Sequence, residues 1–446
     1  MPPRGSKLPW SDRISHGMAH RLLVLSNGHG EDLIALRVIQ ALLARMPGLE
    51  IGVLPLVGDG GIFARDEAAG RLRRLGPRQV LPSGGFSNQS LRGLLRDLAA
   101  GVLGLSWRQW RLVRAWGRRG DPVLAVGDLL PLLLAWAAGG RYGFIGTPKS
   151  DFTWASPAPA GWPARGCDRL SDAYHRSKGS EWDPWEWALM ARPRCRLVAV
   201  RDRLTARGLR GHGVDALAPG NPMMDGFPMG HGTPGLESEG GGVRLLLLPG
   251  SRMPEALANA RRLLESLLAL ADQHSGPVTG LLATGARPAP TELAPLLAAL
   301  GFAPDPAPSG SPMPLPDNGE SIARWQRGRL RLLVGPGRFS SWAPSADAGL
   351  ATAGTATEQL VGLGIPALSI PGPGPQFKPG FARRQSRLLG GAVLPCRTPL
   401  QAAERLAVLL REPALRQRLG AIGRLRMGPA GGSDRLAALV ATRLLG

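Results

Sequence analysis

Short apolar runs recur along the chain at the length of buried strands, and most are followed by stretches with helical spacing. The first run covers 20–25, and a glycine-containing turn separates it from a helix over 33–44 whose apolar positions recur every three or four residues. Continuous apolar runs that alternate with amphipathic helices are typical of parallel sheets covered on both faces. The pattern therefore predicts an α/β protein whose folded part begins at residue 20.

The alternation occurs in two series. We expect strands of the first series at 51–56, 122–126, 142–146 and 197–200, and strands of the second at 243–248, 278–283, 330–334, 349–351 and 367–370. Between them, 226–242 has linker composition. The sequence thus predicts two doubly wound Rossmann-like domains, 20–225 and 243–430, that face each other across a cleft.

Four segments lie outside this alternation. We predict that 1–19 form a disordered basic leader, and that 431–446 form a C-terminal helix that packs back on the first domain. The segment 152–187 is rich in Pro, Gly and Trp, and is interpreted as a long loop over the mouth of the active site. A Pro-rich stretch over 287–320, with one short helix at 291–300, is interpreted as a peripheral insertion.

Composition narrows the class of protein. The three cysteines lie far apart and the seven histidines show no ligand spacing, so we expect neither a disulfide framework nor a metal site. The N-terminus lacks the apolar core of a signal peptide, and the longest apolar run, 122–139, is interrupted by Asp128 and Pro131. We therefore expect a protein of a reducing compartment without a membrane-spanning helix.

The formal net charge of +21 predicts anionic partners. Between Arg65 and Arg119, twelve arginines stand against three acids, and the helical spacing over 91–117 brings in Trp107, Trp110 and Trp116. Arg, Trp and Leu together are typical of a face that lies at a membrane interface. The alternatives are a helix packed on its own domain and a nucleic-acid site, although no nucleic-acid-binding motif accompanies the charge.

A small-residue turn near the C-terminal end of the chain predicts an anion site. The strand at 349–351 runs into Thr352–Thr357, and a helix follows with Glu358 in its first turn. Such a turn leaves backbone N–H groups unpaired at the positive end of the helix dipole, which suits phosphate. Glu358, about one turn further in, can accept hydrogen bonds from two adjacent hydroxyls, as on a ribose; the alternative is that it only complements the dipole.

Further candidates follow other strands. Arg252 comes directly after 243–248, where a guanidinium can bind a diphosphate, and the first domain offers His29, Glu31, Asp32 and Asp128 as candidate general bases. The turn after the first strand lacks both the Lys-Ser/Thr ending of a phosphate-binding P-loop and the dinucleotide fingerprint. A kinase or an NAD-dependent dehydrogenase is therefore disfavoured.

Five segments resemble signatures of a known family. LLLLPGSR (245–252), GNPMMD (220–225) and the stretch 347–372 are similar to lipid-A-disaccharide synthase, and LSNGHGED (25–32) with FIGTPKSDFTW (144–154) is closer to the lipid-A-disaccharide synthase-related proteins. The resemblance implies a GT-B fold, in which two Rossmann-like domains face each other. It also implies transfer of a sugar from a UDP-sugar to a lipid.

The resemblance also implies roles for individual residues. Arg252 matches the arginine that binds the nucleotide phosphates, and Glu358 matches the ribose acceptor. Asp128 falls where the synthase has a catalytic aspartate. The remaining matches are the diphosphate turn (Gly354, Thr355 and Thr357) and Gln385 near the nucleotide-sugar. Independently of the resemblance, we predict that Asn27, Gly28 and Lys149 contact the acceptor or a phosphate; the alternative for Lys149 is a solvated loop residue.

Together these features predict a glycosyltransferase that needs no metal or other cofactor. Its predicted donor is a nucleotide-sugar in which the nucleotide is UDP. We expect a lipid or lipid-like acceptor, peripheral association with the anionic cytoplasmic face of the inner membrane, and no nucleic-acid partner. The alternatives are a sugar-nucleotide epimerase on the same fold and a non-catalytic basic module that binds membranes or nucleic acid.

Overall fold

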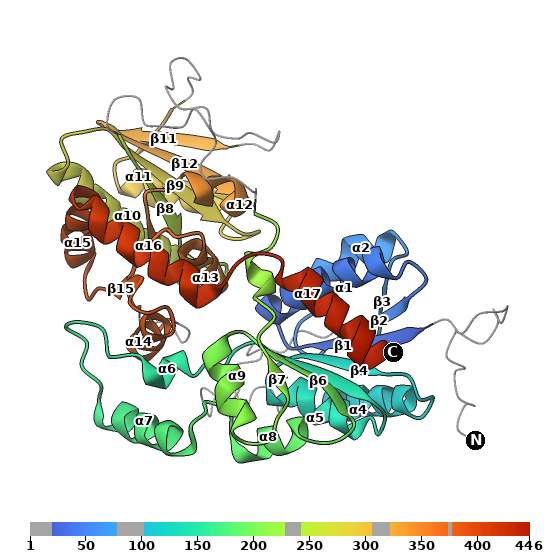
Figure 1. Cartoon of the computed structure of the whole chain (residues 1–446). Helices are drawn as coiled ribbons and strands as arrows, with labels where there is room; N and C mark the ends of the chain where they lie inside the picture. The colour runs from blue at the N-terminus through green and yellow to red at the C-terminus, as the bar shows by residue number, and fades with distance from the viewer. Residues whose placement is uncertain (1–19, 78–101, 228–241, 306–321, 373–376) are drawn as a thin grey trace.

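The computed structural model describes residues 20–77, 102–227, 242–305, 322–372 and 377–446. Two parallel-stranded sheets form two α/β units that lie side by side, and the chain passes between them twice (Figure 1). The predicted leader and most of the predicted linker lie outside the described residues.

The N-terminal unit contains a sheet of order β3-β2-β1-β4-β5-β6-β7, in which all pairs of strands are parallel. The strands are β1 (Arg21–Ser26), β2 (Glu50–Pro55), β3 (Arg73–Arg74), β4 (Val123–Gly127), β5 (Tyr142–Gly146), β6 (Cys195–Val200) and β7 (Ala216–Leu217). The helices are α1 (His29–Arg45), α2 (Ala64–Ala68), α4 (Val102–Gly117), α5 (Leu129–Ala137), α6 (Phe152–Ala155), α7 (Gly166–Lys178), α8 (Pro184–Met190) and α9 (Arg203–Arg210).

The C-terminal unit contains a sheet of order β10-β11-β12-β9-β8-β13-β14-β15. Its strands are β8 (Val243–Leu248), β9 (Val278–Thr284), β10 (Ala303–Pro304), β11 (Ala323–Arg327), β12 (Leu330–Pro336), β13 (Ala348–Ala351), β14 (Ala367–Ser369) and β15 (Val393–Pro395). Its helices are α10 (Glu255–Gln273), α11 (Pro290–Ala299), α12 (Phe339–Trp342), α13 (Thr355–Gly362), α14 (Pro379–Leu388), α15 (Pro399–Arg411) and α16 (Pro413–Met427). The antiparallel edge strands β10 and β11 were not predicted.

Alternate residues of the N-terminal strands face two different cores, as the period of two in a strand requires. On β1, Leu22 and Val24 pack with α1, whereas Leu23 and Leu25 pack with α4 and α5. The last helix, α17 (Gly432–Leu439), and the π-helical turn η5 (Val440–Leu445) join the α1 side of this unit. The end of the chain thus crosses back from the C-terminal unit and covers the N-terminal sheet (Figure 1).

The prediction of a long loop over 152–187 is wrong, because α6, α7 and α8 occupy most of this segment. Local capping explains the difference: Pro184 is the first residue of α8, and the Asp183 N–H donates to Glu186 at 2.8 Å in a capping box. Trp182 is fully buried, and a Cβ atom added at Gly146 would lie 2.6 Å from its ring. In this segment Pro184 therefore begins a helix, and Trp182 packs in the core of the N-terminal unit.

This helical segment also reaches the C-terminal unit, where it contacts α14 (Figure 1). Arg383 binds Asp168 at 2.8 Å, Arg387 binds Asp172 at 2.8 Å, and Arg384 binds Glu181 at 2.7 Å. Three ion pairs between the units therefore hold α14 against α7 and the loop that follows it.

The predicted membrane face on α4 needs one correction. Trp116 is only 7% exposed and packs in the N-terminal core, whereas Trp107 is 58% exposed and stacks on the half-buried Trp110 at 4.7 Å. Trp116 lies one helical turn after Val113, which is also buried, so the core-facing stripe of α4 includes it. Trp116 therefore belongs to the core, and the prediction of a membrane face keeps Trp107 and Trp110.

Because Trp116 is buried and Trp107 is exposed, truncation to alanine should lower the free energy of unfolding much more at Trp116 than at Trp107. Trp116→Ala should lower the free energy of unfolding by about 3–5 kcal/mol, because it leaves a cavity against the backbone of Gly52. Trp107→Ala should change it by less than about 0.5 kcal/mol, because the side chain is largely in solvent. Urea denaturation of both variants measures the difference, and equal losses would contradict this arrangement.

Candidate functional site

The predicted phosphate turn connects β13 to α13 in the C-terminal unit. Its first residue, Thr352, is tied to the neighbouring strand β8, because its N–H donates to the Leu248 carbonyl at 2.9 Å. Gly354 caps α13 without a side-chain hydrogen bond, and the N–H of Glu358 bonds the Gly354 carbonyl at 3.2 Å. The N–H groups of the first helical turn have no intrahelical acceptor, so they are available to an anion.

The carbonyl groups of this turn, in contrast, are held by side chains. The Thr357 hydroxyl donates to the Ala353 carbonyl at 2.6 Å, and Gln385 Nε2 donates to the carbonyls of Ala353 and Gly354 at 3.3 and 3.2 Å. Gln385 is only 3% exposed, so it supports the turn from behind. With their carbonyls bound in this way, Ala353 and Gly354 leave the amide side of the turn open.

Glu358 lies at the contact between the two units. Its carboxylate binds Arg201 Nη2 at 2.8 Å, and Arg201 comes from the loop directly after β6 of the N-terminal unit. The two side chains are 15% and 9% exposed. The candidate ribose acceptor therefore faces the other unit, as a nucleotide site in a cleft between them requires.

The glycine turn of the N-terminal unit approaches the phosphate turn directly. A Cβ atom added at Gly30, in the first turn of α1, would lie 3.2 Å from the Thr355 hydroxyl. Residue 30 therefore has little room for a side chain while the two turns face each other. The N-termini of α1 and α13 meet here, and both dipoles favour negative charge in the space between them.

Glu31 is a carboxylate of the N-terminal unit that lies in the first turn of α1, directly after Gly30. The Thr147 hydroxyl donates to Glu31 Oε1 at 3.2 Å. Burial raises the pKa of Glu31 above its ordinary 4.5, and the negative charges of Asp128 and Glu358 raise it further. A carboxylate whose pKa is shifted toward neutrality is suited to accept a proton.

Asp128 lies next to Glu31, and its carboxylate accepts two hydrogen bonds. Its carboxylate caps α5 by accepting from the Leu130 N–H at 3.1 Å, and Asn27 Nδ2 donates to the same oxygen at 2.7 Å. Burial raises the pKa of Asp128, and these hydrogen bonds offset part of that shift. Asp128 thus caps the start of α5, and its catalytic role stays a prediction.

Lys149 has partners other than a phosphate in the structure. Its ammonium binds Glu186, which is itself buried, and lies 3.3 Å from Asp183. These acids start α8, so Lys149 holds α8 against the end of β5. These two contacts use two of the three donors of the ammonium, and its predicted phosphate contact stays a prediction.

Asp32 is buried on the far side of the first turn of α1, with 5% of its surface exposed. Burial raises its pKa from 3.8 to about 7, and the charge of Glu31 contributes to the shift. His29 is the first residue of α1, but its side chain lies outside the described part of the structure. Burial thus raises the pKa of all three predicted bases whose side chains the structure describes, Glu31, Asp32 and Asp128.

The pKa of Asp32 predicts how stability responds to pH. Because the native state binds this proton more tightly than the unfolded chain, the stabilisation is complete below about pH 4 and is lost as the pH rises through 7. Asp32→Asn should therefore be more stable than the wild type at pH 8.5, by on the order of 4 kcal/mol. Thermal unfolding of both proteins from pH 4 to 8.5 measures the gap; a gap independent of pH would contradict the assignment.

Arg252 lies at the same sheet edge as the phosphate turn, since β8 and β13 are parallel neighbours. It is half-buried, and burial lowers the pKa of its guanidinium while the charge of Glu255 opposes this shift. A guanidinium at this sheet edge is suited in chemistry and charge to bind a diphosphate.

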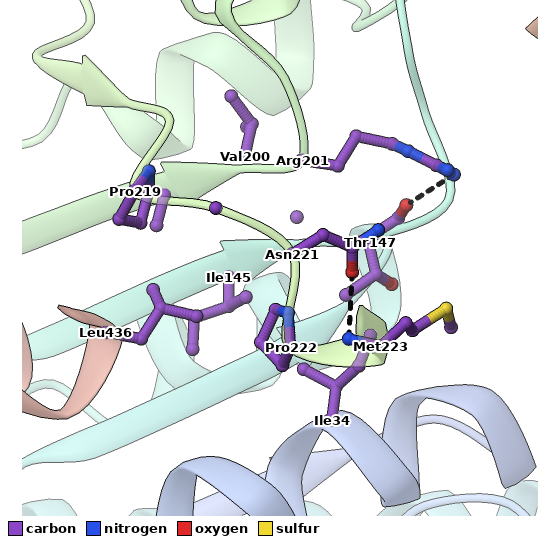
Figure 2. A pocket seen from close by; sticks show the side chains of 13 residues that line it. Ile34, Ile145, Thr147, Val200, Arg201, Pro219, Asn221, Pro222, Met223 and Leu436 are labelled. Atoms are coloured by element: carbon purple, nitrogen blue, oxygen red, sulfur yellow. Dashed lines mark hydrogen bonds between the residues drawn. The ribbon is translucent and has the colours of Figure 1, made fainter. Parts of the chain in front are cut away.

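A small pocket lies beside these polar groups (Figure 2). It contains about 370 Å³ of empty space, part of which is open to solvent, between the ends of β5 and β6 and the segment 219–223. Its lining is mainly apolar, and Thr147 and Arg201 form its polar edge, where Arg201 Nη1 donates to the Thr147 carbonyl at 3.5 Å. A mainly apolar surface therefore adjoins the polar groups of the site.

The sequence pattern missed Arg201 and Thr147 as site residues. Both follow a strand of the N-terminal sheet, at the same position relative to the strand as Asp128. Polar residues that follow parallel strands meet at one sheet edge, where ligands of this fold class bind. This rule, applied to every predicted strand, would have found them.

Among the residues that the structure describes, no helix is both long enough and apolar enough to cross a bilayer. Among these residues there is also no group of three or more His, Cys, Asp or Glu side chains that could hold a metal ion.

Comparison with known proteins identifies the fold. No protein-family model and no curated protein matches the chain. Solved structures do: S. aureus MnaA with UDP (TM-score 0.54, 12% identity, covering 93% of this chain and 94% of that one) and the glycosyltransferase of kitacinnamycin (0.52, 16%, 96% and 100%). A putative UDP-N-acetylglucosamine 2-epimerase from Listeria monocytogenes also matches (0.50, 11%, 94% and 94%).

The fold is GT-B. The prediction of two Rossmann-like α/β domains that face each other is therefore confirmed. At these identities the matches establish the fold alone, and the matched GT-B proteins include both a glycosyltransferase and an epimerase. The particular resemblance to lipid-A-disaccharide synthase stays a prediction.

Proposed function

We propose that this GT-B protein is a glycosyltransferase. It takes a sugar from a nucleotide-sugar donor, a UDP-sugar, and transfers the sugar to a hydroxyl group of an acceptor. The observation that carries the proposal is the open N-terminus of α13, with Glu358 one turn further in and directed at the N-terminal domain. This arrangement offers amides to a diphosphate and a carboxylate to a pair of ribose hydroxyls.

In the proposed mechanism, Arg252 and the amides of Thr355–Thr357 hold the donor diphosphate. Glu31 accepts the proton of the acceptor hydroxyl, and the acceptor oxygen attacks the anomeric carbon in line, with inversion. The bond between that carbon and the diphosphate oxygen breaks, and its electron pair leaves with the diphosphate. The positive end of α13 and the Arg252 guanidinium stabilise the charge that develops there.

A thermal-shift panel of UDP-, GDP- and ADP-sugars tests the donor site. We expect UDP-sugars and UDP itself to raise Tm, because a ligand that binds only the native state stabilises it by an amount that grows with the logarithm of its concentration relative to Kd. GDP- and ADP-sugars should raise Tm less. The proposal fails if no nucleotide diphosphate shifts Tm at millimolar concentration.

For the acceptor we propose a lipid or lipid-like molecule at the cytoplasmic face of the inner membrane, with peripheral association through α4. This helix exposes Trp107 together with Arg108 and Arg111, and its described residues include no acid. Aromatic and basic side chains on one helix favour an anionic interface.

Sedimentation with anionic vesicles tests the membrane surface. Trp107→Ala combined with Arg108→Ala should reduce vesicle binding, whereas Leu425→Ala, which removes a similarly exposed apolar side chain from α16, should not. Unchanged binding of the α4 variant would contradict this part of the proposal.

The second candidate is a sugar-nucleotide epimerase, favoured by the match to a putative UDP-N-acetylglucosamine 2-epimerase. Incubation with a UDP-sugar and no acceptor separates the two. If the epimeric sugar appears, the protein is an epimerase. If the donor stays unchanged without acceptor and is consumed only after an acceptor lipid is added, the protein is a transferase.

A further inference from the structure

In the part of the chain that the structure describes, Arg201 connects the two halves of the proposed site by side-chain contacts to both. It follows β6 at the carboxyl edge of the N-terminal sheet, and its side chain is only 9% exposed. Its Nη2 atom binds Glu358 Oε2 at 2.8 Å and lies 3.5 Å from the sulfur of Met427, while Nη1 donates to the Thr147 carbonyl at 3.5 Å. The guanidinium is therefore fixed from both domains.

These contacts form a continuous path across the cleft. The Thr147 hydroxyl bonds Glu31, the Thr147 carbonyl accepts from Arg201, and Arg201 binds Glu358. The path runs from the proposed base to the proposed ribose acceptor. The position of Glu358 is thus linked to the position of the N-terminal domain.

The ion pair leaves Glu358 able to bind a ligand. A carboxylate has two oxygens and about four acceptor positions, and the structure records Arg201 on Oε2. A guanidinium that is itself fixed by Thr147 restrains the carboxylate oxygen that it binds, and so limits the directions in which the other acceptor positions point. Hydroxyl pairs are recognised best by acceptors fixed in this way.

We propose that Arg201 is a positioning residue: it orients Glu358 so that the site selects a ribonucleotide, and it does so only while the two domains are together. The inference rests on the proposed function, because it assumes that a nucleotide diphosphate binds at α13. It adds that ribose selection in the C-terminal domain depends on a residue of the N-terminal domain.

Isothermal titration of the full chain with UDP and with 2′-deoxy-UDP tests this. We expect the wild type to bind UDP at least about tenfold more tightly than the deoxy analogue, since each hydrogen bond to a charged group contributes about 1.5–3 kcal/mol. In Arg201→Gln the ratio should fall close to one, with little change in the Kd of the deoxy analogue.

Two further variants make the result specific. Arg383→Gln removes the ion pair with Asp168, also between the domains but away from Glu358, and should keep the wild-type ratio. Arg201→Lys keeps the charge but not the planar guanidinium, and its ratio of the Kd for 2′-deoxy-UDP to the Kd for UDP should lie between those of the wild type and Arg201→Gln. If Arg201→Gln does not fold, the ratio of Arg201→Lys tests the inference in its place.

The outcomes separate the inference from the proposed function. A wild-type ratio in Arg201→Gln, or in Arg201→Lys where only that variant folds, overturns the inference while the nucleotide site stands. Tighter UDP binding by an Arg201 variant also overturns it, because Arg201 would then occlude Glu358. A wild type that binds neither nucleotide overturns the proposed function, and the inference with it.

Discussion

Glu358→Ala should raise the donor KM about 100-fold or more, with a much smaller change in kcat. The substitution removes the two hydrogen bonds that the carboxylate is proposed to accept from the ribose, and each contributes about 1.5–3 kcal/mol. Because the ribose takes no part in bond breaking, the loss should fall on ground state and transition state alike and therefore on KM. Steady-state kinetics with varied UDP-sugar measures both constants.

The control for this variant must account for Arg201. Alanine leaves a nearly buried guanidinium unpaired, which costs about 3–5 kcal/mol in comparable cases and lowers stability as well as affinity. Glu358→Gln keeps an oxygen that can accept from Arg201 or the ribose, so its KM should lie between those of the wild type and the alanine variant. Unchanged donor KM in Glu358→Ala, measured well below Tm, would rule out the ribose contact.

Glu31→Gln should lower kcat by about 10²- to 10⁴-fold, the usual contribution of a general base, and leave UDP binding unchanged. The amide has nearly the same shape as the carboxylate and can still bond Thr147, but it cannot accept the proton of the acceptor hydroxyl. Single-turnover rates together with the UDP-induced shift in Tm separate the two effects.

The pH dependence gives a second test of Glu31. A base must be ionised, so the rate should fall as the pH drops through a pKa that lies above the ordinary 4.5. The Thr147 hydroxyl lowers that pKa, so Thr147→Val should move the acidic limb of the profile to higher pH. A Glu31→Gln variant with wild-type kcat would transfer the role of base to another carboxylate, and Asp32, with a pKa of about 7, is the next candidate.

Much of the fold could be predicted from the sequence because its central strands are buried on both faces. Runs such as 243–248 and 278–283 are therefore almost wholly apolar, and they coincide with β8 and β9 within a residue. The turn before Glu358 was predicted for a related reason, because small residues between a strand and a helix leave a local signal. Both features depend on neighbours in the sequence.

Features set by distant contacts could not be predicted in this way. The stripe on α4 is apolar whether it faces a core or a membrane, so its pattern could not show that Trp116 lies inside. The role of Arg201 depends on Glu358, which lies 157 positions further along the chain and in the other domain. The segment 152–187 has the composition of a loop, and only the capping contacts at Asp183 and the burial of Trp182 show why it is helical.

The central claim is that a nucleotide diphosphate binds at the N-terminus of α13 with its ribose on Glu358. An experimental structure of the full chain with UDP tests it most directly. The account predicts diphosphate oxygens within hydrogen-bond distance of the amides of Thr355–Thr357, and ribose hydroxyls on the Glu358 carboxylate. UDP bound elsewhere, or a Glu358 carboxylate without contact to the ribose, would contradict it.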